Sequence, residues 1–219
     1  MARSLSITRR RVGLVDLSLQ ARPNVAAYQF YAAANFDAAF TQFALVPAGG
    51  LRSPSLNTDI QFVVGQFRGL TRFLFDPNDY TTAVPAVNDA NPFFVQIKQV
   101  STAGVVGPAE AMHLILPYNP SPNRSFVLNG SAPSEASLAN SLEIQLPMLC
   151  NDWEFQVNGA ADLFVAFEPS GPEFTVNPLS SDFTNYRHVY TKVSQVFIRG
   201  NGAPTAINAI FTEYNNPTI

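Results

Sequence analysis

The chain has 219 residues, and its net charge of -3 argues against a protein that binds nucleic acid over its whole surface. Hydrophobic residues make up 47% of the sequence, which excludes wholesale disorder, whereas charged residues make up only 13%, about half of the ~25% typical of soluble domains. The single cysteine excludes an internal disulfide, and the two histidines exclude a histidine-rich metal site.

Residues 1–11 are rich in arginine and predict a basic N-terminal arm. Arg3, Arg9, Arg10 and Arg11 are candidate docking residues, because neighbouring arginines repel one another unless an acidic partner neutralises them. The alternative is a solvated, frayed chain end. No apolar stretch of signal-peptide or membrane-span length follows, so we expect synthesis inside the cell and no membrane partner.

Residues 12–117 alternate between apolar and polar positions, as half-buried strands do. Phe93, Val95 and Ile97, for example, fall on one face of a predicted strand. Turn signals such as the Asp-Pro-Asn-Asp sequence at residues 76–79 separate these segments, and long amphipathic helix patterns are absent. The sequence therefore predicts an all-β protein.

Residues 93–108 carry a family resemblance. They begin with Phe93, continue through alternating apolar positions to a small-residue turn at Gly104, and end on Pro108. This pattern resembles strand F and the F–G turn of a fibronectin type III domain, whose strands C, C′, E and G resemble residues 27–32, 38–46, 71–76 and 111–117. The strand B tryptophan is missing, and Phe93 replaces the corner tyrosine. The resemblance implies a β-sandwich over residues 12–117 that acts as a spacer or docking module, and a generic sandwich is the alternative.

The proline-rich residues 118–124 predict a stiff linker to a second domain. Residues 125–219 are expected to fold as a second β-sandwich domain, either a compact sandwich or a jelly-roll-like barrel. The candidate strands of this domain are residues 126–129, 142–147, 153–157, 163–168, 174–177, 186–190, 193–199 and 206–214. Three of its segments resemble small β domains of tailed-phage virion proteins, namely residues 161–169, 193–200 and 206–212. This second resemblance implies a structural protein of a virus particle.

No residue pattern predicts catalysis, so we expect a protein that is not an enzyme and has no catalytic residues, cofactor or metal. His113 would share its strand with Glu110, but an odd offset places the two side chains on opposite faces. His188 has no metal ligand at a suitable spacing. Cys150 has no neighbouring histidine, so a buried structural thiol is expected.

Two pairs of carboxylates flank predicted turns. Asp76 and Asp79 could gather oxygens around Ca²⁺, and Glu168 with Glu173 could serve acid catalysis. Polar residues are, however, common in such turns simply as turn formers. We therefore expect neither function.

Aromatic residues make up 12% of the sequence, and several alternate so that one set would point away from the core. Tyr28 and Phe30 would point one way and Tyr31 the other. The same holds for two phenylalanine pairs, Phe40 with Phe43 and Phe164 with Phe167. The outward set would need cover, either from neighbouring subunits or, where strands bulge, from the chain's own core.

Sparse charge and abundant aromatic residues together predict a surface covered by neighbours, although a sandwich solubilised by Asn, Ser and Thr is the alternative. We therefore expect a non-enzymatic virion structural protein, a capsid-decoration, vertex or tail-attachment component of a tailed phage, assembled in the host cytoplasm. Its partners would be copies of itself and other virion proteins, with neither nucleic acid nor a small-molecule substrate. The alternatives are a carbohydrate-binding or adhesin module, which exposed Trp or Tyr would support, and a sandwich enzyme, which a cleft with facing carboxylates would support.

Overall fold

The fold is known from a computed structural model, which describes residues 7–11, 14–20, 22–48, 53–54, 61–67, 70–117, 123–178 and 186–214. The regular elements in these ranges are β-strands and two short 3-10 turns, so the predicted all-β class is confirmed. None of the described segments forms a helix that could cross a membrane. The chain makes two compact units, residues 1–34 with 38–118 and residues 35–37 with 119–219.

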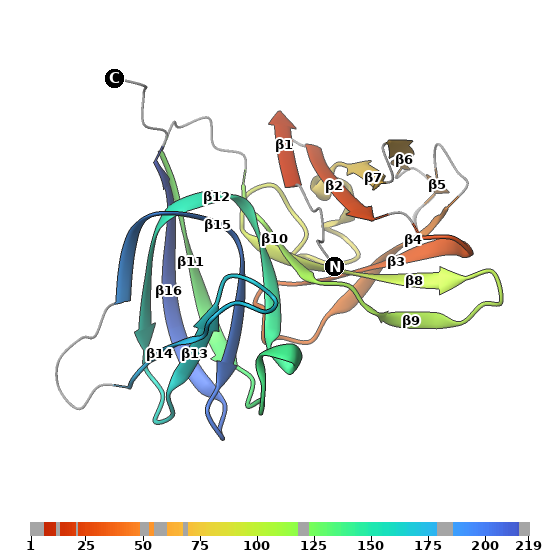
Figure 1. Ribbon diagram of the computed structural model, residues 1–219. Helices are drawn as coiled ribbons and strands as arrows, with labels where there is room; N and C mark the ends of the chain where they lie inside the picture. Colours follow the sequence, from red (N-terminus) through yellow and green to blue (C-terminus); the bar gives the residue numbers. More distant parts are fainter. Residues whose placement is uncertain are drawn as a thin grey trace. The chain divides into compact units, whose positions relative to one another are not determined.

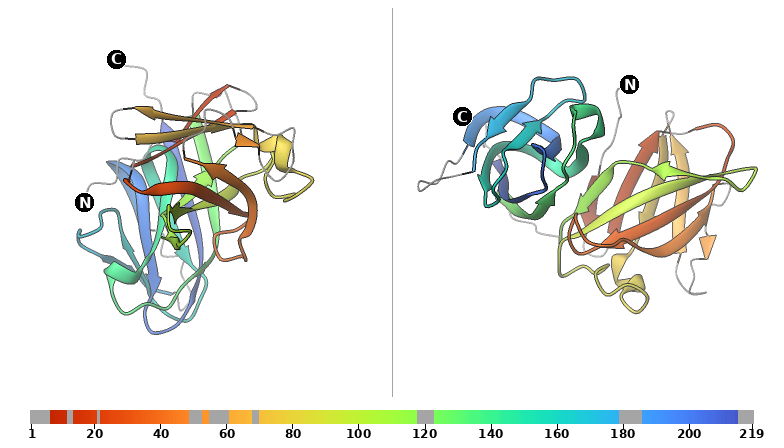
Figure 2. Two further views of the ribbon diagram at one scale, coloured as in Figure 1. Left: turned by 90° about the vertical axis from the view of Figure 1, so that its right-hand side faces the viewer. Right: turned by 90° about the horizontal axis from the view of Figure 1, so that it is seen from below.

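The first unit is a sandwich of two antiparallel sheets (Figures 1 and 2). One sheet has the order β1-β2-β7-β6-β5, with β1 Ile7–Arg11, β2 Leu14–Gln20, β7 Leu70–Phe75, β6 Gln61–Phe67 and β5 Ser53–Pro54. The other has the order β4-β3-β8-β10, with β4 Thr41–Pro47, β3 Val25–Ala33, β8 Phe93–Ser101 and β10 Met112–Ile115. β9 (Val106–Ala109) pairs with β8 on the side that β10 also uses. For β1, β5 and β6 the structure describes the backbone alone.

An aromatic cluster fills the core of the first unit. Phe30 on β3 has no exposed surface, and its ring makes edge-to-face contacts with Phe43 and Phe73 at centroid distances of 6.0 and 5.0 Å. Tyr80, at the end of the 3-10 turn η1 (Pro77–Tyr80), contacts the rings of Phe43 and Phe75. Such contacts are favoured because the positive edge of one ring meets the negative face of the next. Much of the phenylalanine in this half of the sequence is therefore core.

The second unit contains six described strands in the order β14-β13-β15-β12-β16-β11. They are β11 Asn123–Ala132, β12 Leu142–Val157, β13 Leu163–Ala166, β14 Phe174–Val176, β15 Tyr186–Gly200 and β16 Thr205–Tyr214. The sequence predicted eight short strands in this region, and that division is wrong. Residues 142–147 and 153–157 belong to one long strand, and residues 186–190 and 193–199 belong to another.

Breaks in register explain how β12 continues through residues that predict an interruption. Its pairing with β15 shifts between Gln145 and Cys150, and again between Cys150 and Asp152. Pro147 has no N–H to donate. It lies within the first shift, between the paired residues Gln145 and Cys150, where the ladder with β15 does not need that N–H. Beyond the shifts, Trp153 resumes the inward alternation and is buried.

Gly200, the last residue of β15, lies where distant parts of the second unit's sheet meet. Its N–H donates to the Pro133 carbonyl at 2.7 Å, and it pairs in parallel with Ser134, just after β11. The sheet thereby curls into the barrel-like form seen in Figure 2. A Cβ atom at Gly200 would lie 2.0 Å from the Ala203 carbonyl oxygen, so only glycine permits this backbone approach.

Replacing Gly200 with alanine is therefore expected to lower the free energy of unfolding by about 1–3 kcal/mol, because backbone atoms must move to admit the methyl group. Gly107→Ala is the matched control, since a Cβ there would meet the Gln99 carbonyl oxygen at 3.5 Å, an ordinary contact. Urea unfolding of the two variants measures the difference. Equal stabilities would contradict the role given to Gly200.

Residues 35–37 belong to the second unit, although the predicted first domain, residues 12–117, includes them. Asp37 Oδ2 accepts a hydrogen bond from the Ser131 N–H at 2.9 Å. The Phe36 ring covers Gly130, where a Cβ atom would lie 2.5 Å from the ring. The Asn-Gly sequence at this point is typical of a hairpin turn, but it lies inside β11, where glycine makes room for the ring.

Candidate functional site

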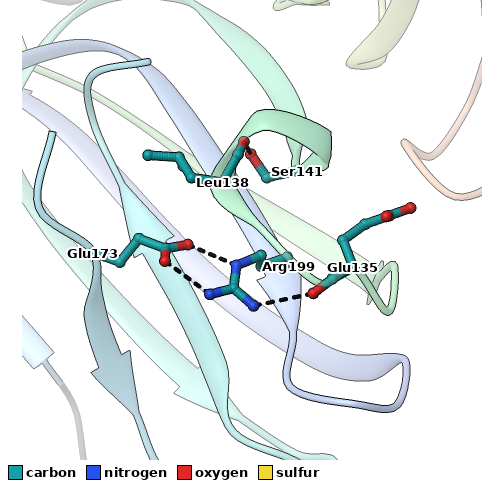
Figure 3. Close-up of polar contacts among 5 residues, drawn as sticks. All are labelled: Glu135, Leu138, Ser141, Glu173 and Arg199. Carbon is teal, nitrogen blue, oxygen red and sulfur yellow. Dashed lines mark hydrogen bonds and ion pairs between the residues drawn. The ribbon is translucent and has the colours of Figure 1, made fainter. Parts of the chain in front are cut away.

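Arg199 and Glu173 form a polar cluster on β15 and just before β14 (Figure 3). Arg199 donates from Nε and Nη2 to the two Glu173 carboxylate oxygens at 2.7 and 2.8 Å, and from Nη1 to the Glu135 carbonyl at 3.0 Å. The hydrogen bond from Arg199 lowers the pKa of Glu173, and the same bond raises the pKa of Arg199. Both groups therefore remain charged near neutral pH, and the pair is suited to holding strands together rather than to transferring protons.

The two predicted carboxylate pairs have different surroundings. Glu173 is directed at Arg199, whereas Glu168 is exposed. Asp76 Oδ1 accepts a hydrogen bond from the Asn78 N–H at 2.9 Å and so caps η1, and burial, followed by the charge of Asp76, raises the pKa of Asp79. Among the described residues, no group of three or more His, Cys, Asp or Glu side chains is placed to hold a metal ion.

His113 lies on β10 and is fully buried, with Val95 of β8 as its register partner. Val95 belongs to the core cluster, so His113 faces the core side of its sheet. In the described part of the chain, neither ring nitrogen has a hydrogen-bond partner. Burial lowers the pKa of His113 to about 4, so the imidazole is neutral under physiological conditions.

Three further candidates, Glu110, Cys150 and His188, lie between β9 and β10, on β12 and on β15. Glu110 accepts hydrogen bonds from Gln99 and Arg22. The thiol of Cys150 is buried, as expected. The side chain of His188 lies outside the described residues.

The predicted docking arginines begin the first unit. Arg9, Arg10 and Arg11 lie on β1, whose backbone pairs with β2, so this part of the expected arm is the outer strand of a sheet. Their side chains, and the whole of Arg3, lie outside the described residues. Docking through these arginines therefore stays a prediction.

Cations of the same chain cover two of the rings that point away from the core. Lys98 Nζ lies 4.6 Å from the centroid of the Tyr31 ring, and Arg199 Cζ lies 4.1 Å from that of Phe164. Phe167 packs against other rings of the second unit. Phe167, which follows the end of β13, therefore reaches the core as the second alternative expected, whereas Tyr31 and Phe164 each lie under a cation of the same chain.

The large hydrophobic side chains exposed in the described part of the chain are aliphatic: Leu45, Val105, Val106, Val127, Leu149 and Ile210. Val127 on β11 and Ile210 on β16 are register partners, with exposed fractions of 50% and 39%. They form an apolar pair on the outer face of the second unit.

Val105 and Val106 lie at the turn between β8 and β9, which extends outward in Figure 1. Ser101 fixes this turn, because its N–H donates to the Val105 carbonyl at 2.9 Å and its Oγ accepts from the Val105 N–H at 3.1 Å. Gly104 takes a φ of 77°, which favours glycine. A well-defined turn thus presents two valines to solvent.

The sequence indicates that two of these aliphatic residues are exposed, although the exposed residues it was expected to contain were aromatic. Val127 alternates with Phe126 and Leu128, both buried, so it must face outward. Val105 directly follows a turn glycine, a position that turns usually give to solvent.

No protein-family model matches the chain, and no curated protein matches it.

Proposed function

We propose that the chain is a non-enzymatic structural subunit of a virus particle, a capsid-decoration, vertex or tail-attachment component of a tailed phage. It acts by binding copies of itself and other particle proteins. The observation that carries the proposal is a charge-poor chain whose exposed large hydrophobic side chains, in the described part, lie on strands and at a defined turn. Protein interfaces have cores depleted in charge, and exposed apolar patches commonly mark interaction sites.

The first unit is proposed to be a fibronectin type III-like docking or spacer module. Its sheets, β1-β2-β7-β6 and β4-β3-β8 with β9 and β10, correspond to strand orders A-B-E-D and C′-C-F-G of immunoglobulin-like sandwiches. The segments that resemble strands C, C′, E and F overlap β3, β4, β7 and β8. A module of this kind supplies surfaces rather than chemistry, which agrees with the proposed role.

The carbohydrate-binding alternative receives less support from the described residues. Trp153, the single tryptophan, is only 3% exposed and stacks on Phe174 inside the second unit. Sugar-binding surfaces of the expected kind would need such rings to face solvent.

The proposal is tested by quantitative mass spectrometry of purified particles from cells whose virus encodes the chain. We expect the chain in a fixed copy number relative to the major shell or tail protein, retained after density-gradient purification. A chain abundant in the lysate but missing from the particles would overturn the proposal.

Replacing Arg9, Arg10 and Arg11 together with glutamine is expected to weaken binding to particles without unfolding the chain. The pairing of β1 with β2 comes from backbone hydrogen bonds, which glutamine retains. Co-sedimentation at rising salt measures the effect, because the wild-type attraction should be screened while the variant's residual binding should vary little. Arg22→Gln, a change at an exposed arginine beyond β1, is the control; equal binding by the triple variant and this control would remove the docking role.

A further inference from the structure

β11 is an outer strand of the second unit. It pairs with β16 from Asn123 to Ala132 without a bulge, and with no other named strand in the described part of the chain. Such an edge presents unpaired N–H and C=O groups, which are a template for pairing with another strand.

Two hydrogen bonds show which backbone groups of β11 face away from β16. Opposite residues of an antiparallel ladder alternate between pairs that exchange both N–H···O bonds and pairs that exchange none. The Ser131 N–H donates to Asp37 at 2.9 Å, and the carbonyl of its partner Ala206 accepts from the Asn158 N–H at 2.8 Å, so Ser131 and Ala206 form a pair of the second kind. By alternation, the outward N–H and C=O groups further along the edge belong to Ser125, Val127 and Asn129.

These outward groups are self-complementary. If a second copy of β11 lies antiparallel with Val127 opposite Val127, then Ser125 faces Asn129 on either side, and each pair can exchange two N–H···O bonds. The ladder ends where the Ser131 N–H is already occupied by Asp37. We propose that two chains associate through their β11 strands in this register, about a two-fold axis at Val127. This rests on the proposed function and names one contact of its self-association.

The side chains of this edge favour the same partner. Residues 125–129 contain no charged side chain, so the symmetric register brings no like charges together. Val127 would lie beside its copy, and with Ile210 of each chain the pair would form a continuous aliphatic row across the joined sheets. The exposed valine and isoleucine are thereby covered.

Other outer strands carry features that oppose pairing. They are β1 with Arg9–Arg11, β5 with Pro54, β9 with Pro108, β4 with a terminal Pro47, and β14 with a length of three residues. β11 has neither a proline nor a lysine among its ten residues. The contrast points to β11 as the edge at which strand addition can occur.

Sedimentation equilibrium of the full chain tests the proposal. We expect a dimer for the wild type and a monomer for Val127→Pro. Proline removes the outward N–H that the pairing between the two chains needs, and the ladder with β16 does not use this N–H. Val127→Lys, which places like charges at the two-fold axis, should also give a monomer. Val106→Lys is the control, with the same change at a similarly exposed valine, and should remain dimeric.

Cysteine crosslinking tests the register. In the proposed pairing the Val127 Cα atoms lie about 5.5 Å apart, within disulfide range, so Val127→Cys should form a disulfide dimer on mild oxidation. The Asn129 Cα atoms of the two copies would lie four residues apart along the strands, roughly 14 Å, so Asn129→Cys should not. Crosslinking of both variants alike would contradict the register.

The outcomes separate this proposal from the function on which it rests. If the wild type is a dimer or larger and the Val127→Pro and Val127→Lys variants are as well, pairing through β11 is overturned but self-association is kept. A wild-type chain that is monomeric at the highest soluble concentration but still occurs in particles overturns the β11 pairing and the self-association, and keeps the role as a particle subunit. A monomer that is also missing from particles overturns both.

Discussion

Replacing Glu173 with alanine is expected to lower the free energy of unfolding by about 3 kcal/mol, because the buried Arg199 guanidinium then loses its bidentate carboxylate. The effect falls at the lower end of the range for broken buried ion pairs, since about a quarter of the Glu173 side chain is exposed. Urea or thermal unfolding at neutral pH measures the loss.

Two further variants show whether the loss comes from the unpaired cation. Glu168→Ala, an exposed acid of the same turn region, should change stability by less than about 0.5 kcal/mol. Glu173→Leu combined with Arg199→Met should recover most of the stability, because no charge then remains buried. A double variant as unstable as Glu173→Ala would show that packing rather than charge decides.

The contribution of Glu173 should also depend on pH in a defined direction. Its pKa is lowered in the folded state, so the stabilisation is complete above the unfolded value near 4.5 and is lost as the pH falls through the folded value. The stabilities of the wild type and Glu173→Ala should therefore converge in acid.

His113 is expected to make the fold sensitive to mild acid. The unfolded imidazole has a pKa near 6.5 and the folded one about 4, so below pH 6.5 the unfolded chain binds the extra proton. As the pH falls from 6.5 to 4, the free energy of unfolding should decrease by about 3 kcal/mol in total. The whole of this decrease is present below pH 4. Above pH 6.5 the residue adds no pH dependence.

His113→Leu should remove this acid-sensitive step. At neutral pH the variant should be at least as stable as the wild type, because the two buried ring nitrogens, which lack partners in the described part of the chain, no longer pay for desolvation. Unfolding free energies at pH 7.5, 6, 5 and 4 test both statements, the pH series being chosen to bracket the linkage window. An unchanged fall between pH 6.5 and 4 in the variant would exclude His113 as the cause.

The sequence predicts the fold where local alternation decides it. β3 and β8 are found where the pattern places them, and Phe30 points inward, because a strand with one buried face must place every second side chain in the core. The long strand β12 is not predictable in this way, since its continuation through Pro147 depends on a register shift against β15, a strand distant in sequence.

The partners of polar side chains are harder to predict from a single sequence. The sequence pairs Glu173 with its near neighbour Glu168, because both flank one turn, but in the structure its partner is Arg199 on β15. In the same way, alternation shows that Tyr31 points away from the core but not that Lys98 covers it. Contacts between residues on different strands follow from register, which a single sequence specifies only weakly.

The pairing of β11 with β16 has a consequence for synthesis of the protein. These are the first and last described strands of the second unit, joined along ten residues. Until residues 205–214 have left the ribosome, β16 cannot pair with β11, so Phe126 and Leu128 lack the strand beside them. Contacts between residues this far apart in the sequence form late in folding. The growing chain thus passes through an interval in which this half is open to chaperones, and a stalled translation product would be left with an unfinished, aggregation-prone half.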